Sequence, residues 1–167
     1  MMLPKIYKPG PGFQEAYSTI EMVETILSPI NEYLQNKTIF CPCDCDESSF
    51  VIWLKENTNS NIINVGDKDV NGEESREIMK TVDLVITDPP FAKEVFDPFI
   101  EFMKSNNIKF LMLGPYKINY CDDMVSEYKC QEDIFWKHKL VTGEPHKVRG
   151  RMYTNDKEIM KYSLKTY

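Results

Sequence analysis

Short apolar runs alternate with helix-spaced segments along the middle of this chain. Four runs have the length and composition of buried strands, at 38–43, 61–65, 82–87 and 108–114. Three segments between them have the spacing of helices, at 48–57, 73–80 and 97–106. Ser48 or Ser49 is a suitable N-cap for the first helix, and Asp97 followed by Pro98 predicts the start of the third. This alternation predicts an α/β fold, with a mostly parallel central sheet and helices on both faces.

The two ends of the chain have less regular patterns. Apolar residues between Phe13 and Leu34 follow a helical spacing, which Pro29 should kink or split. Toward the C-terminus we expect a helix near 122–128, where an acidic pair would start it. Strand-like stretches follow at 132–141 and 148–164.

Length and composition are those of one globular domain. The chain has 167 residues, of which 42% are hydrophobic and 12% aromatic, enough to bury a core. We divide this domain into an N-terminal loop at 1–12, a core at 13–155 and a basic C-terminal part at 137–167. No apolar run reaches the length of a membrane span, and the first residues lack a signal-peptide core. We therefore expect a cytoplasmic protein that does not bind membranes.

Three of the five cysteines alternate along the chain, at 41, 43 and 45. In a cytoplasmic protein these should be reduced thiols. Zinc sites favour cysteine pairs separated by two residues, completed by further cysteines or histidines, whereas the two histidines here lie far off at 138 and 146. We therefore expect thiols that pack around a ligand-binding loop, and no metal.

Charge is unevenly distributed along the chain. The net charge is −6, which argues against general affinity for nucleic acid. From residue 137 to the end, however, eight Lys and Arg stand against three Asp and Glu. Lys147, Arg149 and Arg151 in this part could contact a phosphate backbone. The alternative is a solvated surface with no partner.

Acidic side chains follow the first three predicted strands. Asp44 and Asp46 follow the first strand, Asp67 and Asp69 the second, and Asp88 the third. In parallel sheets, ligands bind outside the carboxyl ends of the strands. Carboxylates there would accept hydrogen bonds from ribose hydroxyls and an adenine amine but would repel phosphate, and the sequence has no glycine-rich phosphate-binding motif. These features favour a nucleoside with a positive centre, and S-adenosylmethionine is the obvious candidate.

Asp88, Pro89, Pro90 and Phe91 directly follow the third strand. They resemble the [DN]PP[YFW] catalytic loop of amino-methyltransferases, which transfer a methyl group from S-adenosylmethionine to a planar NH2 group. In such a loop, the Asp88 side chain and a backbone carbonyl such as that of Pro89 would accept both amine hydrogens. The prolines would fix these acceptors, and Phe91 would stack on the target. The alternative is an ordinary proline turn capped by Asp88.

Further blocks of the chain resemble the adenine-specific DNA methyltransferases of the EcoRI type. The blocks are TIFCPCDCDESSFVIWLKEN, DLVITDPPF, KFLMLGPYKINY and RGRMYTN, and the resemblance covers about residues 13–155. It implies a single Rossmann-like, S-adenosylmethionine-dependent methyltransferase domain. It also implies that the methyl group goes to the exocyclic N6 amine of an adenine flipped out of DNA.

The resemblance assigns roles to residues that would bind the cofactor. They are Tyr17, Ser18, Thr19, Cys41, Pro42, Cys43, Asp44, Asp46, Ser48, Ser49, Phe50, Asp67, Asp69 and Val70. The first three match a stretch at the methionine end of the cofactor. Asp44 and Asp46 would contact its amino group. Asp67 would face the ribose, and Asp69 the adenine amine.

The chain is short for this family, so target recognition is expected to need a homodimer or a partner subunit. Three alternatives to a DNA substrate or an active enzyme stay open. The same loop chemistry serves methyltransferases of RNA and of protein amides. The chain could also be a catalytically inactive partner subunit that keeps the methyltransferase fold.

Overall fold

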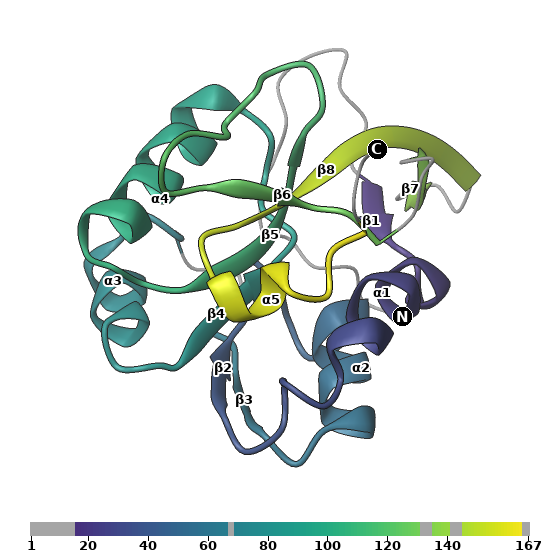
Figure 1. Cartoon of the computed structure of the whole chain (residues 1–167), viewed down its shortest axis with the longest axis horizontal. Helices are drawn as coiled ribbons and strands as arrows, with labels where there is room; N and C mark the ends of the chain where they lie inside the picture. Colours follow the sequence, from purple (N-terminus) through teal and green to yellow (C-terminus); the bar gives the residue numbers. More distant parts are fainter. Residues whose placement is uncertain (1–15, 67–68, 131–134, 141–144, 165–167) are drawn as a thin grey trace.

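Figure 1 shows the computed structural model, which describes residues 16–66, 69–130, 135–140 and 145–164, with the backbone alone at 16–17, 135–140 and 145–149. Its strands are β1 Ala16–Ser18, β2 Thr38–Phe40, β3 Asn61–Ile63, β4 Leu84–Thr87, β5 Phe110–Pro115, β6 Ser126–Tyr128, β7 Phe135–Leu140 and β8 Pro145–Thr154. Its helices are α1 Ile20–Leu27, α2 Ser49–Asn57, α3 Glu73–Met79, α4 Lys93–Ser105 and α5 Lys157–Met160, with a 3-10 turn, η1, at Ser28–Ile30.

One sheet runs through the molecule in the order β1-β7-β8-β5-β4-β2-β3, and β6 also pairs with β8. The pairs β3–β2, β2–β4 and β4–β5 are parallel. Antiparallel pairing joins β8 to β5, both β6 and β7 to β8, and β1 to β7. The predicted α/β fold with a parallel central sheet is confirmed.

Helices cover both faces of the sheet (Figure 1). Successive residues of a strand point to opposite faces, so Ile39 and Leu84 pack in a core with residues of α1, α2 and α5. Phe40 and Val85, one position further along each strand, pack in a second core with residues of α3 and α4. Buried apolar residues on both faces explain why these strands read as continuous apolar runs.

The long strand β8 extends beyond the parallel core. Gly150 pairs with Pro115, the last residue of β5, and the rest of β8 up to Thr154 continues along β5. The preceding residues, 145–149, pair with β7 instead, and β1 lies on the outer side of β7. Because β8 is antiparallel to β5, the β7–β8 hairpin extends past the carboxyl end of β5. That is the edge at which parallel sheets bind ligands.

The N-terminal helix is shorter than predicted. Ala16–Ser18 is strand β1, and α1 begins only at Ile20, where the Thr19 hydroxyl accepts a hydrogen bond from the Met22 N–H (3.3 Å). Helical spacing cannot reveal β1, because its partner β7 lies far along the chain. Pro29 lies in η1, which directly follows the end of α1 at Leu27, so the helical segment is split at this proline as expected.

Helix α4 begins at Lys93, upstream of the predicted cap Asp97. The Ala92 carbonyl accepts hydrogen bonds from the N–H groups of Val95 (2.9 Å) and Phe96 (2.8 Å). Pro98 therefore lies inside the helix, where its ring removes one N–H donor. The early start places the Phe96 ring in the core, fully buried, and this burial offsets the lost hydrogen bond.

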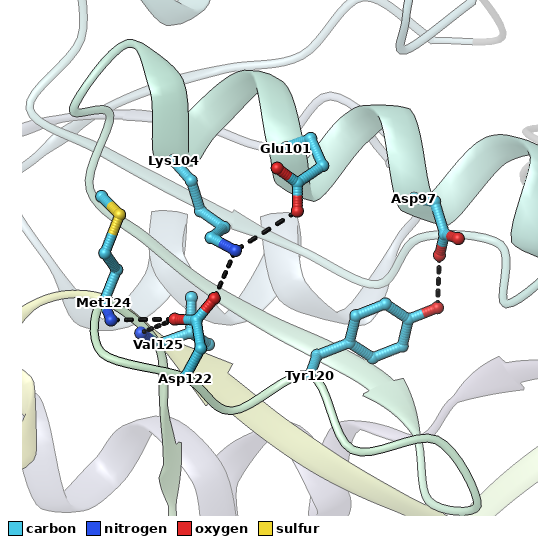
Figure 2. Close-up of polar contacts among 7 residues, drawn as sticks. All are labelled: Asp97, Glu101, Lys104, Tyr120, Asp122, Met124 and Val125. Atoms are coloured by element: carbon cyan, nitrogen blue, oxygen red, sulfur yellow. Dashed lines mark hydrogen bonds and ion pairs between the residues drawn. The ribbon is translucent and has the colours of Figure 1, made fainter.

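The helix predicted near 122–128 is instead a turn followed by strand β6. The Asp122 carboxylate closes the turn by accepting hydrogen bonds from the N–H groups of Met124 (2.8 Å) and Val125 (2.9 Å), as Figure 2 shows. The strand expected at 148–164 ends at Thr154, and the short helix α5 follows. In the part of the chain that the structure describes, no helix is both long and apolar enough to cross a membrane.

Candidate functional site

The loop after β2 folds around a buried carboxylate. Asp44 is only 2% exposed. Its Oδ1 accepts a hydrogen bond from the Ser48 hydroxyl (2.5 Å), and its Oδ2 accepts one from the Thr87 hydroxyl (2.7 Å). Thr87 ends β4, and its Oγ1 also accepts a hydrogen bond from the Cys43 N–H (3.0 Å). Asp44 and Thr87 thus tie the loop after β2 to the end of β4.

Burial raises the pKa of Asp44 from 3.8 to about 7. The hydroxyls of Ser48 and Thr87 and the backbone N–H of Asp88 hydrogen-bond the carboxylate and oppose this rise, whereas the charge of Asp88 adds to it. A carboxyl group with this pKa changes between its protonated and ionised forms near neutral pH.

The Asp88–Phe91 loop follows β4 directly and is held at its first residue from two sides. The Ser18 hydroxyl donates a hydrogen bond to Asp88 Oδ2 (2.5 Å), and the Asp88 N–H hydrogen-bonds Asp44. Pro89 is buried. Phe91 is half-buried and packs against the core on the α1 and α2 side of the sheet. The loop therefore has a fixed backbone.

Two further residues of the predicted site meet this loop. Ser49, the first residue of α2, donates from its hydroxyl to the Ser18 carbonyl (2.8 Å). Thr19, next to Ser18, caps α1. The end of β1, the start of α2 and the loop after β4 therefore come together, although the sequence separates them widely. The side chain of Tyr17 lies outside what the structure describes.

The segment after β3 supplies an exposed carboxylate at the same edge. The Asp69 carboxylate accepts a hydrogen bond from the Asn71 N–H (2.9 Å), and its carbonyl accepts one from the Gly72 N–H (3.0 Å). This turn leads into α3. Val70 is buried in the core on the α3 and α4 side. Asp67 lies outside the described residues.

The environment of the buried Cys43 thiol is strongly acidic. Burial raises the pKa of Cys43 well above its ordinary value, and the charges of Asp44, Asp88 and Asp69 raise it further. These charges come from the loops after β2, β4 and β3, which are neighbouring strands of the sheet. Among the residues the structure describes, no three His, Cys, Asp or Glu side chains are grouped as metal ligands.

Asp46 lies on the exposed rim of this edge. Its carboxylate accepts a hydrogen bond from Asn64 Nδ2 (2.9 Å) and lies 3.5 Å from Lys55 Nζ. The Asn64 hydrogen bond and the Lys55 charge lower the pKa of Asp46. Asp46 therefore stays ionised near neutral pH, in contrast to Asp44 two residues earlier.

The segment after β5 is fixed to α4, the helix that starts just after the Asp88–Phe91 loop. Figure 2 shows the Tyr120 hydroxyl donating to Asp97 Oδ1 (2.5 Å) and Lys104 Nζ pairing with Asp122. The Tyr120 ring also packs on the Phe96 ring, with centroids 4.6 Å apart. These contacts fix the segment after β5 against α4.

The remaining residues of the loop after β2 lie beneath the site. Cys41, Pro42 and Phe50 are buried, and Phe50 belongs to the core on the α1 and α2 side. No protein-family model matches the chain, and no solved structure matches it.

The chain is similar to a type II methyltransferase. This relative, from Mycoplasma genitalium, is 29% identical over a 129-residue alignment that covers 60% of this chain and 40% of the relative. The chain thus matches less than half the length of this type II methyltransferase.

The predicted phosphate contacts lie on β8. Arg151 is half-buried: its guanidinium stacks on the Tyr116 ring, 4.7 Å from the centroid, and lies 4.0 Å from the Glu127 carboxylate. Lys147 and Arg149 belong to the outer half of β8, which pairs with β7 beyond the carboxyl end of β5. All three positions are therefore on the strand that reaches past the candidate site.

Sequence reasoning missed two polar residues that organise the site. Thr87 is fully buried at the end of β4. In the sequence it is a polar residue at the end of an apolar run. That position could have indicated a hydrogen-bonding role, because buried hydroxyls need partners. Asn64 directly follows β3 and bonds Asp46, and its place after a strand was the corresponding signal. The contact between Ser18 and Asp88 had no signal in the sequence.

Proposed function

We propose that this chain is an S-adenosylmethionine-dependent methyltransferase acting on the N6 amine of adenine in DNA. The observation that carries the proposal is the placement of Asp88, which contacts Ser18 at the end of β1 and Asp44 in the loop after β2, at the edge where parallel sheets bind ligands. The similarity to a type II methyltransferase supports methyl transfer and a DNA substrate. The Asp-Pro-Pro-Phe sequence of the loop supports an amine as the methyl acceptor.

The charges at this edge fit S-adenosylmethionine, which carries a sulfonium and an ammonium group. The charges of Asp44, Asp69 and Asp88 all raise the pKa of Cys43, and a negative field of this kind favours a cation over a phosphate. The exposed Asp69 carboxylate is a suitable acceptor for ribose hydroxyls or the adenine amine. We assign cofactor binding to the Cys41–Phe50 loop, to Asp67, Asp69 and Val70, and to Tyr17 and Thr19 at the end of β1.

The chain's own residues position the acceptor amine. When bound, S-adenosylmethionine would supply the methyl group to the amine nitrogen and leave as S-adenosylhomocysteine, and the nitrogen would lose one proton to solvent. The Asp88 carboxylate and the Pro89 carbonyl accept the two amine hydrogens, which favours a pyramidal nitrogen. Pro89 and Pro90 restrict the loop backbone, and the exposed part of the Phe91 ring stacks on the flipped base.

We assign DNA binding to the β7–β8 hairpin. Alternation along β8 places residues 147, 149 and 151 on one face of the strand. In the backbone register, Lys147 pairs with Lys137 of β7, so both strands of the hairpin carry basic residues that suit a phosphate backbone. The hairpin extends past β5 at the edge that carries Asp88, so DNA held there would lie near the proposed catalytic loop.

The single domain over residues 1–167 stays a prediction. So does the use of a homodimer or partner subunit for target recognition. Light scattering coupled to size-exclusion chromatography, with and without duplex DNA, measures the mass of the assembly and tests the second prediction.

Methyl transfer with labelled cofactor tests the proposed function. Duplex DNA, single-stranded DNA, RNA and protein are offered in parallel to wild type, Asp88→Ala and the control Asp123→Ala, which alters an exposed residue of the Asp122 turn. We expect label in the N6-methyladenine of DNA. Asp88→Ala should abolish it while cofactor affinity, measured by calorimetry, stays within a few-fold, and Asp123→Ala should behave as wild type.

Each other result would change the proposed substrate, the proposed activity or the catalytic assignment. Label only in RNA or protein would replace DNA as the substrate. Cofactor binding without transfer to any substrate, or no cofactor binding at all, would favour an inactive partner subunit. Wild-type transfer by Asp88→Ala would remove the catalytic assignment.

A further inference from the structure

We propose that Ser18 is a positioning residue for the Asp88 carboxylate. The proposal rests on the proposed function, because it takes Asp88 as the group that binds the acceptor amine. It changes the role that the resemblance gives to Ser18, from a cofactor contact at the methionine end to a residue that acts through Asp88.

The polar atoms of Ser18 are engaged within the protein. The residue is 4% exposed. Its hydroxyl donates to Asp88 Oδ2 at 2.5 Å, and its carbonyl accepts a hydrogen bond from the Ser49 hydroxyl at 2.8 Å. A serine hydroxyl has one proton to donate, and here that proton lies on Asp88. Ser49 in turn fixes the backbone from which the hydroxyl projects.

The hydrogen bond acts on the Asp88 side chain itself. The bond from the Asp88 N–H to Asp44 holds the main chain, and the Ser18 hydroxyl contacts the carboxylate. A hydroxyl donor at 2.5 Å is a strong, charge-assisted contact that selects one rotation. It also favours the ionised carboxylate, which is the form that accepts hydrogen bonds from an amine.

Ser18 and Asp88 contact each other although their strands, β1 and β4, are far apart in the strand order. Strand β1 stands four positions from β4 in the strand order, which in a flat sheet would be about 19 Å. Contact between the two side chains requires the outer strands to curl back over the carboxyl edge. The contact is therefore a built feature of the tertiary structure and cannot come from chain neighbours.

The experiment compares kcat at saturating cofactor with the Kd for the cofactor. The variants are Ser18→Ala, which removes the donor, Ser18→Thr, which keeps it, and the control Ser126→Ala, which removes an exposed serine hydroxyl of β6. We expect Ser18→Ala to lower kcat roughly 10- to 100-fold while Kd changes less than three-fold. Ser18→Thr should restore kcat to within about five-fold of wild type, and Ser126→Ala should match wild type.

Other outcomes overturn the proposal. A Kd that weakens with kcat unchanged would make Ser18 a cofactor ligand. Parallel loss of kcat and affinity would reflect general damage to the site. Unchanged values would remove any role, and failure of Ser18→Thr to recover kcat would show that the hydroxyl is not the active feature. If thermal unfolding shows that Ser18→Ala does not fold, Ser18→Cys, a near-isosteric weak donor, replaces it.

Hydrogen exchange separates this proposal from the proposed function. Peptides covering residues 84–96 should exchange at least about five-fold faster in Ser18→Ala than in wild type or Ser126→Ala, because the Asp88–Phe91 loop loses an anchor. Unchanged exchange would overturn the anchor even in an active enzyme. If wild type transfers no methyl group at all, the proposed function fails, and faster exchange would still support the Ser18 anchor.

Discussion

The buried carboxyl group of Asp44 should make the stability of this protein depend on pH in a way that one substitution removes. Burial raises the pKa of Asp44 to about 7 in the folded chain, whereas an unfolded chain leaves it near 3.8, its ordinary value. The perturbation is Asp44→Asn, which is similar in shape but carries no titratable group.

The sign follows from proton binding. Between the unfolded pKa and the folded pKa, the native state binds more protons at Asp44 than the unfolded state does, so the free energy of unfolding falls as pH rises. This contribution is fully present below about pH 4 and is lost as pH passes the folded value of about 7. Between pH 5 and pH 8 the loss is on the order of 2–3 kcal/mol.

Urea unfolding followed by tryptophan fluorescence at several pH values from 5 to 8 measures this loss. Other groups titrate in the same range, so the quantity to compare is the difference between wild type and Asp44→Asn. That difference should change by about 2–3 kcal/mol across the range. The control is Asp46→Asn, because the lowered pKa of Asp46 keeps it ionised throughout.

The expected control result is a constant offset between Asp46→Asn and wild type from pH 5 to pH 8. In Asp44→Asn, the new amide NH2 group must face the hydroxyl of Ser48 or Thr87, which now donates to a carboxylate oxygen. The resulting loss of stability does not vary with pH. Parallel curves for wild type and Asp44→Asn would therefore refute the reasoning. They would mean that Asp44 is not buried as a titrating group in solution.

Two further predictions concern binding. Asp67→Ala and Asp69→Ala should each weaken cofactor affinity, one more than the other. The reason is that a buried donor of the cofactor that loses its acceptor costs on the order of 1–3 kcal/mol. Unchanged calorimetric affinity in both variants would contradict the cofactor assignment. Replacing Lys147, Arg149 and Arg151 together by Ala should flatten the salt dependence of DNA binding, by a slope of roughly one per lost phosphate contact, and leave cofactor affinity unchanged. An unaltered slope in filter-binding titrations would make these residues solvated surface.

The parallel core could be predicted from the sequence because its strands pack apolar residues on both faces. Strands β2, β3 and β4 lie within the predicted runs, and β5 ends one residue beyond its run. Helix α2 begins where the capping residues indicate, and α3 begins at Glu73 as predicted, whereas α4 begins early. The early start of α4 shows the limit of cap rules. A proline suited to a first turn is tolerated inside the helix when an aromatic such as Phe96 gains full burial.

The errors at the two ends share a different cause. Strand β1 has three residues, and the helix expected at 122–128 is a turn closed by Asp122. In both places a distant strand, β7 or β8, provides the partner that decides the local structure. Local propensity contains no information about such partners, so short strands of this kind override it.

In the candidate site, too, some features could be predicted from the sequence and others depend on distant contacts. Asp44, Asp69 and Asp88 could be placed at one edge from the sequence because topology alone puts residues after parallel strands there, and their shared effect on the pKa of Cys43 is consistent with this. Their individual environments were not predictable. Asp44 and Asp46 are both carboxylates of one loop, yet one is buried among hydroxyls and the other lies on the rim beside Lys55.

The strand order connects the proposed catalytic loop to the proposed DNA-binding hairpin. Ser18, which bonds Asp88, pairs with His138 in the middle of β7, next to Lys137 and its partner Lys147. A phosphate backbone that bound the hairpin would therefore contact the strand to which β1 is hydrogen-bonded. Because β1 is short and has no other strand neighbour among the residues described, its position depends on β7. Substitution in the hairpin should thus affect methyl transfer through Asp88 as well as through DNA affinity, whereas a substitution at Asp69, on the far side of β4, should affect cofactor binding alone.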